Sequence, residues 1–272
     1  MVFEGGLIAR EITAGIRASL VGDAPIVRAI VMAPSAATES YLRIKEARAR
    51  EAGMYLELIR MENDATTEDL LEKIALPGAD SIIVQLPLPE QVDTKTVLDA
   101  IPLSLDADVL STAAHDAFEK GDSDALLPPV VAAMKEILER SGVEVQGKRA
   151  VVIGQGWLVG EPCAAWLAQA GVSVETLTRD SGDLSILKNA DIVVSGAGSP
   201  GLIRPEHLMN GVVLIDAGTS ESGGAIVGDA DPACAELASV FTPVPGGVGP
   251  IAVACLFANA ALLTKRHGLQ SR

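Results

Sequence analysis

Ala150-Val-Val-Ile-Gly-Gln-Gly-Trp-Leu-Val-Gly160 is the segment from which the architecture of this chain is most directly predicted. Its first four residues suit a buried strand, and a helix is expected to start after the glycines. Glycines at such a turn let the backbone approach a diphosphate, and the free N–H groups at the helix start favour its negative charge. The spacing is one residue longer than the usual G-x-G-x-x-G, so the glycines alone also suit a plain tight turn. The predicted dinucleotide contacts are Gly154, Gln155, Gly156, Trp157 and Gly160.

The next expected strand, over 173–177, ends at Thr178-Arg179-Asp180. At this distance from the glycine loop, a Rossmann domain reads the ribose of adenosine. Arg179 would meet a 2′-phosphate and Asp180 would bond a 2′-hydroxyl, whereas a solvated charge pair explains both residues equally well. These residues therefore leave the choice between NADP and NAD open.

Alternating strand-like and helix-like segments extend this pattern across the chain. Strands are expected over 26–32, 54–58, 81–85, 150–153, 173–177, 191–194 and 212–216, and helices over 7–20, 38–52, 66–74, 130–140 and 161–169. Short, nearly continuous apolar strands separated by helices are typical of parallel sheets covered on both faces. We therefore predict two doubly wound α/β domains with a cleft between them, the second a Rossmann dinucleotide-binding domain. The expected domains are 1–125, completed by a helix over 250–268, and 126–249.

Composition excludes several classes of protein. Among 272 residues, 21 basic and 36 acidic side chains give a net charge of −15, which argues against a general nucleic-acid or anionic-membrane surface. No apolar run reaches the ~18 residues of a membrane helix, and the N-terminus lacks a signal-peptide pattern, so the cytoplasm is the expected location. Cys163, Cys234 and Cys255 are scattered, as are the three histidines, so neither a disulfide nor a metal site is expected.

Three further motifs narrow the chemistry. Tyr41 and Lys45 lie four residues apart on the expected helix, hence on one face, with Thr38 as its expected N-cap. Val84-Gln-Leu-Pro-Leu-Pro89 leaves a strand abruptly, which puts Gln85 at the carboxyl edge where α/β sheets bind ligands. Thr242-Pro-Val-Pro-Gly-Gly-Val-Gly-Pro250 predicts a rigid loop that a ligand can approach closely.

Together with Asp106-x-Asp108 and Ile215-Asp-Ala-Gly218, these motifs resemble the bifunctional methylenetetrahydrofolate dehydrogenase/methenyltetrahydrofolate cyclohydrolase family. The motifs occur in family order over nearly the whole chain, and the two proline-rich strings are far more specific than a glycine loop. The resemblance implies oxidation of 5,10-methylenetetrahydrofolate to the methenyl form with NADP or NAD. It also implies hydrolysis to 10-formyltetrahydrofolate, tetrahydrofolate derivatives as ligands, and a homodimer.

The resemblance also implies roles for individual residues. Lys45 would act as general acid/base on the water that attacks the methenyl carbon, and Gln85 would orient its amine. Tyr41 would stack on the aminobenzoyl ring, and Asp108 would bond the amino edge of the pterin. The segment Pro245, Gly246 and Gly247 would line the folate and nicotinamide, and Gly218 is assigned to the coenzyme. An amine beside a cationic methenyl group should lose proton affinity, which suits a lysine base.

Four departures from the family pattern limit this transfer. Leu105-Asp-Ala-Asp-Val109 replaces Lys-Asp-Val-Asp-Gly, and because a valine disfavours positive φ, Asp108 would sit differently if the turn requires it. Pro128-Pro-Val-Val131 replaces Pro-Cys-Thr-Pro. Gln155-Gly156 replaces an Arg/Ser pair that serves the phosphates, so NAD becomes conceivable although the resemblance slightly favours NADP. For Trp157, packing into the core is favoured over capping of the adenosine.

Two other functions stay open at this point. The altered Asp108 turn and glycine loop also suit a folate- or nucleotide-binding protein that has lost one or both activities. A Rossmann dehydrogenase for an amino acid or hydroxy acid is a third reading, but it leaves Val84-Gln-Leu-Pro-Leu-Pro89 unexplained.

Overall fold

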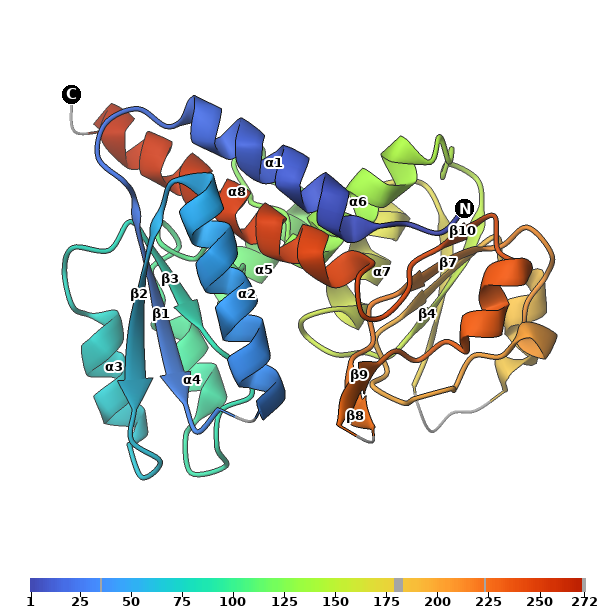
Figure 1. Ribbon diagram of the computed structural model, residues 1–272, viewed down its shortest axis with the longest axis horizontal. Coiled ribbons are helices and arrows are strands. Elements are labelled where there is room, and N and C mark those ends of the chain that lie inside the picture. The colour runs from blue at the N-terminus through green and yellow to red at the C-terminus, as the bar shows by residue number, and fades with distance from the viewer. Residues whose placement is uncertain (35, 179–182, 223, 271–272) are drawn as a thin grey trace. The chain divides into compact units, whose positions relative to one another are not determined.

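The computed structural model describes residues 1–34, 36–178, 183–222 and 224–270 (Figure 1). The chain divides into two compact units, which are named here by their sheets. The three-strand unit holds Arg10–Pro129 and Val253–Arg272, and the five-strand unit holds Met1–Ala9 and Val130–Ala252. The first nine residues belong with the five-strand unit because Phe3 N donates to Phe241 O (2.9 Å) and Phe241 N donates to Met1 O (2.9 Å).

The three-strand unit contains a parallel sheet in the order β2-β1-β3. Its strands are β1 (Ile26–Met32), β2 (Tyr55–Met61) and β3 (Ser81–Val84), and its helices include α2 (Ala36–Ala52), α3 (Thr67–Ile74), α4 (Thr94–Asp99) and α5 (Thr112–Lys120). Val27 and Ala29 share a core with residues of α2 and of the C-terminal helix, whereas Ile30 shares a second core with residues of α3 and α4. Alternate residues of β1 thus face opposite helix layers, as the doubly wound pattern requires.

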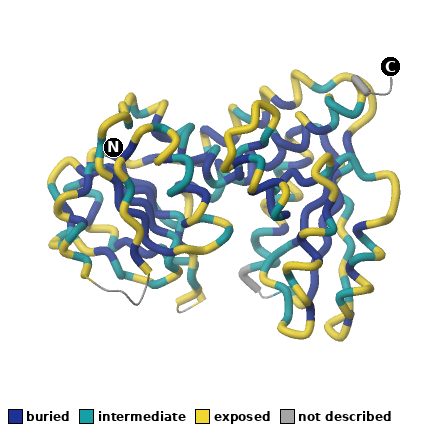
Figure 2. The backbone as a smooth tube through the Cα atoms, turned by 180° about the vertical axis from the view of Figure 1, so that it is seen from behind, coloured by how far each residue is buried: buried dark blue, intermediate teal, exposed yellow. Residues whose placement is uncertain are grey.

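The five-strand unit contains a parallel sheet in the order β10-β7-β6-β4-β5. Its strands are β4 (Arg149–Ile153), β5 (Ser173–Leu177), β6 (Ile192–Ser195), β7 (Val213–Asp216) and β10 (Val240–Phe241). The elements around this sheet are α6 (Pro129–Arg140), α7 (Gly160–Gln169), the 3-10 helices η1 (Leu184–Asn189), η2 (Pro205–His207) and η3 (Pro232–Glu236), and the hairpin β8 (Ser220–Ser222) and β9 (Ala225–Val227). In Figure 2 the inner strands of both sheets are mostly buried, whereas the edge strands β2 and β5 and many of the connecting loops are largely exposed or half-buried.

Both sheets repeat one topology: the first strand lies between the second and the third. The chain therefore reverses direction of winding beside β1 in one unit and beside β4 in the other. Ligands of open α/β sheets bind outside the carboxyl ends of the strands at such a reversal. The segments that follow β1, β3, β4 and β6 are consequently the places to look for a site.

Two long helices have residues in both units: α1 (Gly5–Ser19) and α8 (Val248–Gln270). The length and composition of Val248–Gly268 also suit a membrane span, so the expectation that no stretch meets those criteria is wrong. However, 61% of the most apolar window is buried within the structure, as in the core helix of a soluble protein. The membrane reading of α8 therefore has weak support.

Helix α2 differs from its expected N-terminus. It begins at Ala36, so Thr38 lies inside the first turn and is not the N-cap. At the other end of the helix, Gly53 has φ +81° and its N–H donates to Arg50 O (3.1 Å). A glycine takes this left-handed conformation without strain, which ends the helix at Ala52.

Candidate active site

Lys45 and Gln85 meet at the carboxyl edge of the three-strand sheet. Lys45 comes from α2, which follows β1, and Gln85 is the first residue after β3. Lys45 Nζ donates to Gln85 Oε1 at 2.9 Å. Gln85 Nε2 donates to Leu86 O (2.8 Å), so its amide is oriented with the oxygen toward the amine. The backbone fixes the same residue, since Gln85 N donates to Ile30 O (2.9 Å).

Asp108 completes the charged group around this amine. Burial lowers the pKa of Lys45, and the negative charge of Asp108 partly opposes that shift. Burial also raises the pKa of Asp108, with Lys45 opposing the change and Asp106 adding to it. The two groups are therefore close enough to influence each other's ionisation. A lysine with a lowered pKa gives up its proton more readily than a solvated lysine, which is the property required of a general acid/base.

A tight turn over residues 106–111 carries Asp108. The carboxylate of Asp106 is buried and accepts four hydrogen bonds: both oxygens accept from Leu110 N (3.0 Å each), and Oδ2 accepts from Ser111 N (2.8 Å) and Ser111 Oγ (2.7 Å). Val109 lies in this turn with φ +56°. The turn thus adopts the left-handed conformation in spite of the valine, and the hydrogen bonds to Asp106 hold it there. A β-branched residue in this conformation is strained.

We expect Val109→Gly to cost far less stability than removal of an equally buried valine in relaxed backbone. A left-handed non-glycine residue costs about 1–2 kcal/mol, which glycine recovers, while loss of the buried side chain costs about 1.5–3 kcal/mol. Val97 of α4 is the matched control, because it is also fully buried but lies in a right-handed helix. Denaturant unfolding should give a loss below about 1.5 kcal/mol for Val109→Gly and about 3 kcal/mol for Val97→Gly. Equal losses would show that the turn stores no strain.

Asn259 supports the same turn and was missed by the sequence analysis. Its Nδ2 donates to Ala107 O and to Leu127 O, each at 2.9 Å, and the residue is buried. One side chain of α8 thus ties the Asp108 turn to the segment that precedes Pro128-Pro129. The sequence feature that could have identified Asn259 is its position as the one amide within the otherwise apolar run 250–263. A buried amide needs partners, and here both partners are backbone carbonyls.

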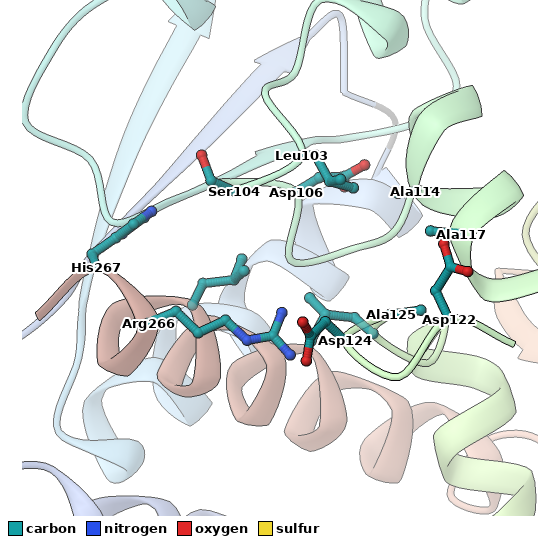
Figure 3. A pocket seen from close by; sticks show the side chains of 12 residues that line it. Leu103, Ser104, Asp106, Ala114, Ala117, Asp122, Asp124, Ala125, Arg266 and His267 are labelled. Carbon is teal, nitrogen blue, oxygen red and sulfur yellow. The ribbon is translucent and has the colours of Figure 1, made fainter. Parts of the chain in front are cut away.

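A cavity borders this turn at Asp106 (Figure 3). It has a volume of about 730 Å³. Its lining residues are Leu103, Ser104, Asp106, Ala114, Ala117, Asp122, Asp124, Ala125, Leu126, Leu263, Arg266 and His267. Asp106 is the feature shared with the turn, whereas none of the predicted site residues lines this cavity.

The glycine loop of the five-strand unit is packed too tightly for side chains at two positions. Gly154 has φ +99° and donates its N–H to Leu177 O (2.8 Å). A Cβ on Gly160 would lie 2.0 Å from Gly154 O, so the strand end and the start of α7 touch through backbone alone. By contrast, a Cβ on Gly156 would meet nothing within 4 Å. Gly156 therefore lies against open space, which suits close approach of a diphosphate.

The two residues that neighbour Gly156 are not buried. Gln155 is exposed and its Nε2 donates to Thr176 Oγ1 on β5 (3.3 Å). Trp157 is half-buried, so the expectation that its ring packs into the core is not met. Arg179 and Asp180, predicted at the ribose, lie outside the described residues.

The proline-glycine loop belongs to the five-strand unit. Pro245 and Gly246 are exposed, and the buried Gly247 donates its N–H to Pro243 O (2.7 Å). Gly5, which the sequence analysis missed, holds this loop: its N–H donates to Gly246 O (2.8 Å), and a Cβ would lie 1.9 Å from Gly247 O. Gly218 is buried after β7, and its N–H donates to Asp216 Oδ1 (3.0 Å).

No group of three or more His, Cys, Asp or Glu side chains that could hold a metal ion occurs among the described residues.

Comparisons with known proteins agree with this geometry. Residues 3–108 match the tetrahydrofolate dehydrogenase/cyclohydrolase catalytic domain, and residues 128–268 match the NAD(P)-binding domain of the same family. The chain is 35% identical over 283 residues to the bifunctional protein FolD of Staphylococcus aureus, covering 99% of each protein. A FolD crystal structure from Campylobacter jejuni superimposes with a TM-score of 0.93 at 27% identity, covering 98% of this chain and 99% of that one. The Trypanosoma brucei FolD structure with NADP cofactor and inhibitor has the same TM-score at 31% identity, covering 98% of each chain. The chain therefore belongs to the tetrahydrofolate dehydrogenase/cyclohydrolase family.

Proposed function

We propose that this protein oxidises 5,10-methylenetetrahydrofolate and hydrolyses the methenyl product to 10-formyltetrahydrofolate, with Lys45 as the general acid/base of the second reaction. Family membership assigns the two activities. The hydrogen bond of 2.9 Å between Lys45 Nζ and Gln85 Oε1 supports the role of the lysine, because it holds an amine of lowered pKa in one orientation.

The first reaction breaks one C–H bond of the carbon that joins N5 and N10 of the substrate. NAD(P), when bound, would supply the acceptor for the hydride. Loss of the hydride converts the carbon to a methenyl cation. The protein contributes orientation and exclusion of water, because hydride transfer itself needs no proton at Lys45. The exposed Pro245 and Gly246 and the turn that carries Asp108 are the proposed substrate contacts.

In the second reaction, a water molecule attacks the methenyl carbon and loses a proton to the neutral amine of Lys45. The bond between this carbon and N5 then breaks as N5 takes that proton from Lys45. The new hydroxyl on the carbon releases its own proton to solvent, which leaves a neutral formyl group on N10. Gln85 keeps the amine oriented through both transfers by accepting its hydrogen bond. Asp108 stabilises the ammonium form between them, since its charge raises the pKa of Lys45. We assign Asp108 to the amino edge of the pterin and Tyr41, one turn before Lys45 on α2, to the aminobenzoyl ring.

The coenzyme site is proposed at the loop after β4. Backbone N–H groups at the start of α7 and the open space at Gly156 suit a diphosphate. Gln155 is bonded to β5, on the side where the adenosine ribose would lie. We propose NADP as the preferred coenzyme on the family resemblance, with NAD as the alternative, because Gln155 and Gly156 supply no cation for a 2′-phosphate.

A spectrophotometric assay of both steps with each nicotinamide tests the proposal. Purified protein and methylenetetrahydrofolate should generate reduced nicotinamide, with a lower KM for NADP than for NAD. Added methenyltetrahydrofolate should lose its absorbance without any nicotinamide. Calorimetric binding of folate with neither reaction would favour the alternative of a binding protein that has lost its activities.

The cellular setting and assembly are also proposals. Cys163, Cys234 and Cys255 are buried and belong to no disulfide among the described residues, which suits a reducing compartment, and we propose the cytoplasm. Family resemblance supports a homodimer. Sedimentation equilibrium at several protein concentrations measures the oligomeric state directly.

A further inference from the structure

Two buried carboxylates, neither of which was recognised as functional from the sequence, lie at the carboxyl edge of the five-strand sheet. Asp229 is completely buried and accepts hydrogen bonds from the segment that follows β6. The donors are Ser195 Oγ (2.7 Å), Ala197 N (2.8 Å) and Gly198 N (3.3 Å) to Oδ2, and Ser199 N (2.6 Å) to Oδ1. A single side chain from outside the segment thus determines the backbone path of residues 195–199.

Asp216, the last residue of β7, is nearly as buried and organises the next segments along the same edge. Its Oδ1 accepts from Gly218 N (3.0 Å), and its Oδ2 accepts from Ala230 N (2.8 Å). Its own N–H donates to Thr242 Oγ1 (2.7 Å), at the start of the proline-glycine loop. The carboxylate and backbone of Asp216 therefore connect the segments that follow β7, β9 and β10.

The two carboxylates interlock through glycines. A Cβ on Gly218 would lie 2.1 Å from Asp229 Oδ2, and a Cβ on Gly228 would lie 2.2 Å from Asp216 Oδ2. Each acid thus occupies the space left by a glycine on the other acid's segment. This reciprocal arrangement joins the segments after β6, β7, β9 and β10 into one hydrogen-bonded cluster.

Burying two acids together is costly. Burial is the main reason that the pKa of Asp216 is raised to about 6, and the charge of Asp229 adds to the shift. Apolar residues would usually stabilise a fold as well or better than such a cluster, so a role in positioning deserves a direct test. The position of the two carboxylates beside β6 and β7 indicates which ligand they serve. A dinucleotide bound across β4 has its adenosine half toward β5, so its nicotinamide half extends over β6 and β7.

We propose that Asp229 and Asp216 are positioning residues for the dinucleotide, which hold the segments after β6 and β7 in the conformation that binds its nicotinamide half. The inference rests on the proposed dehydrogenase function. It adds a determinant of coenzyme affinity that acts through the backbone and touches neither the folate nor Lys45.

Asp229→Asn is the main test. The amide has nearly the same shape, but its NH2 group replaces one acceptor oxygen and faces backbone or hydroxyl donors. We expect the KM and the calorimetric Kd for NADP to rise by about tenfold, with kcat at saturating coenzyme within about threefold of wild type. Hydrolysis of methenyltetrahydrofolate should stay within about twofold, because it needs no nicotinamide and uses residues of the three-strand unit.

Asp191→Asn is the matched control. Asp191 also accepts a backbone hydrogen bond in this sheet, from Arg149 N (2.9 Å), but it lies at the opposite, amino edge. Its replacement should leave the KM for NADP unchanged. If it raises the KM as much as Asp229→Asn, or if Asp229→Asn leaves KM and Kd within about twofold of wild type, the proposal is wrong.

If Asp229→Asn fails to fold, Ser195→Ala tests the same proposal. It removes one donor to Asp229 and leaves the carboxylate in place, and we expect the KM for NADP to rise by about threefold. An unchanged KM in this variant would overturn the proposal. The calorimetric Kd distinguishes failure of this proposal from failure of the proposed function. If the wild-type protein binds NADP but shows no turnover, the proposed dehydrogenase activity is wrong. The Kd values of wild type and variants can still be compared in that case, so they still test the positioning role.

Discussion

Lys45→Met is expected to slow hydrolysis of methenyltetrahydrofolate by about three orders of magnitude, because the attacking water loses its proton acceptor. The side chain keeps its length and apolar stem, so α2 and its packing should persist. Oxidation of methylenetetrahydrofolate should stay within about tenfold of wild type, since hydride transfer needs no base at this position. The loss of methenyl absorbance and the gain of reduced nicotinamide absorbance measure the two steps separately.

Arg50→Met is the control on the same helix. Arg50 lies in the last turn of α2, with its side chain 78% exposed, so its loss removes a positive charge without touching the site. Both activities of this variant should match wild type. Unimpaired hydrolysis by Lys45→Met would eliminate Lys45 as the base.

The pH dependence of hydrolysis provides a further check on Lys45. The base must be neutral, so the rate should increase with pH as the amine loses its proton. Because burial lowers the pKa of Lys45 from 10.5, the inflection should fall clearly below that value. The inflection should disappear in Lys45→Met. An inflection at about 10.4, as for a solvated lysine, would contradict the buried environment.

Gly160→Ala should produce the largest loss of stability and coenzyme binding among single substitutions in the glycine loop. The added Cβ would lie 2.0 Å from Gly154 O and 2.6 Å from Gly154 C, both backbone atoms that cannot move without separating α7 from β4. We expect a loss of about 3 kcal/mol or more in the free energy of unfolding, together with loss of measurable NADP binding. Thermal or denaturant unfolding and calorimetry measure the two effects.

Gly156→Ala separates packing from ligand approach. Its Cβ would enter open space, so the free energy of unfolding should change by less than about 0.5 kcal/mol. If a diphosphate lies against Gly156, the methyl group should still weaken NADP binding. Normal binding by Gly156→Ala would place the coenzyme elsewhere, and normal stability of Gly160→Ala would refute the close packing of the loop.

The sequence predicted the bounds of two strands of different character, the apolar run of β1 and the mixed polar and apolar β5. The expected strands over 26–32 and 173–177 agree with β1 and β5 residue for residue. Helix α5 was missed because its nine residues include the exposed polar residues Asp116 and Glu119, and only its few inward-facing residues carry the helical pattern. The hairpin of β8 and β9 was missed because three-residue strands are too short to show a period.

The site was predictable where it depends on local spacing, and not where it depends on distant partners. Tyr41, Lys45 and Gln85 could be placed because helical periodicity and the end of a strand fix their positions. Asn259 and Asp229 could not, because their partners lie 152 and 34 residues away in the chain. Nothing in the sequence near either residue indicates which backbone groups it will bond.

The close contacts between these glycines and carboxylates also constrain which amino-acid substitutions this protein can accept during evolution. Gly218 and Asp229 form one mutually dependent pair, and Gly228 and Asp216 form another, because a side chain at either glycine would collide with the carboxylate opposite. Substitutions within each pair should therefore show strong epistasis: alanine at 218 becomes tolerable only after residue 229 has been shortened. In a directed-evolution library that substitutes one position at a time, most clones changed at these four positions should be inactive. A library that changes both members of a pair together should contain viable sequences.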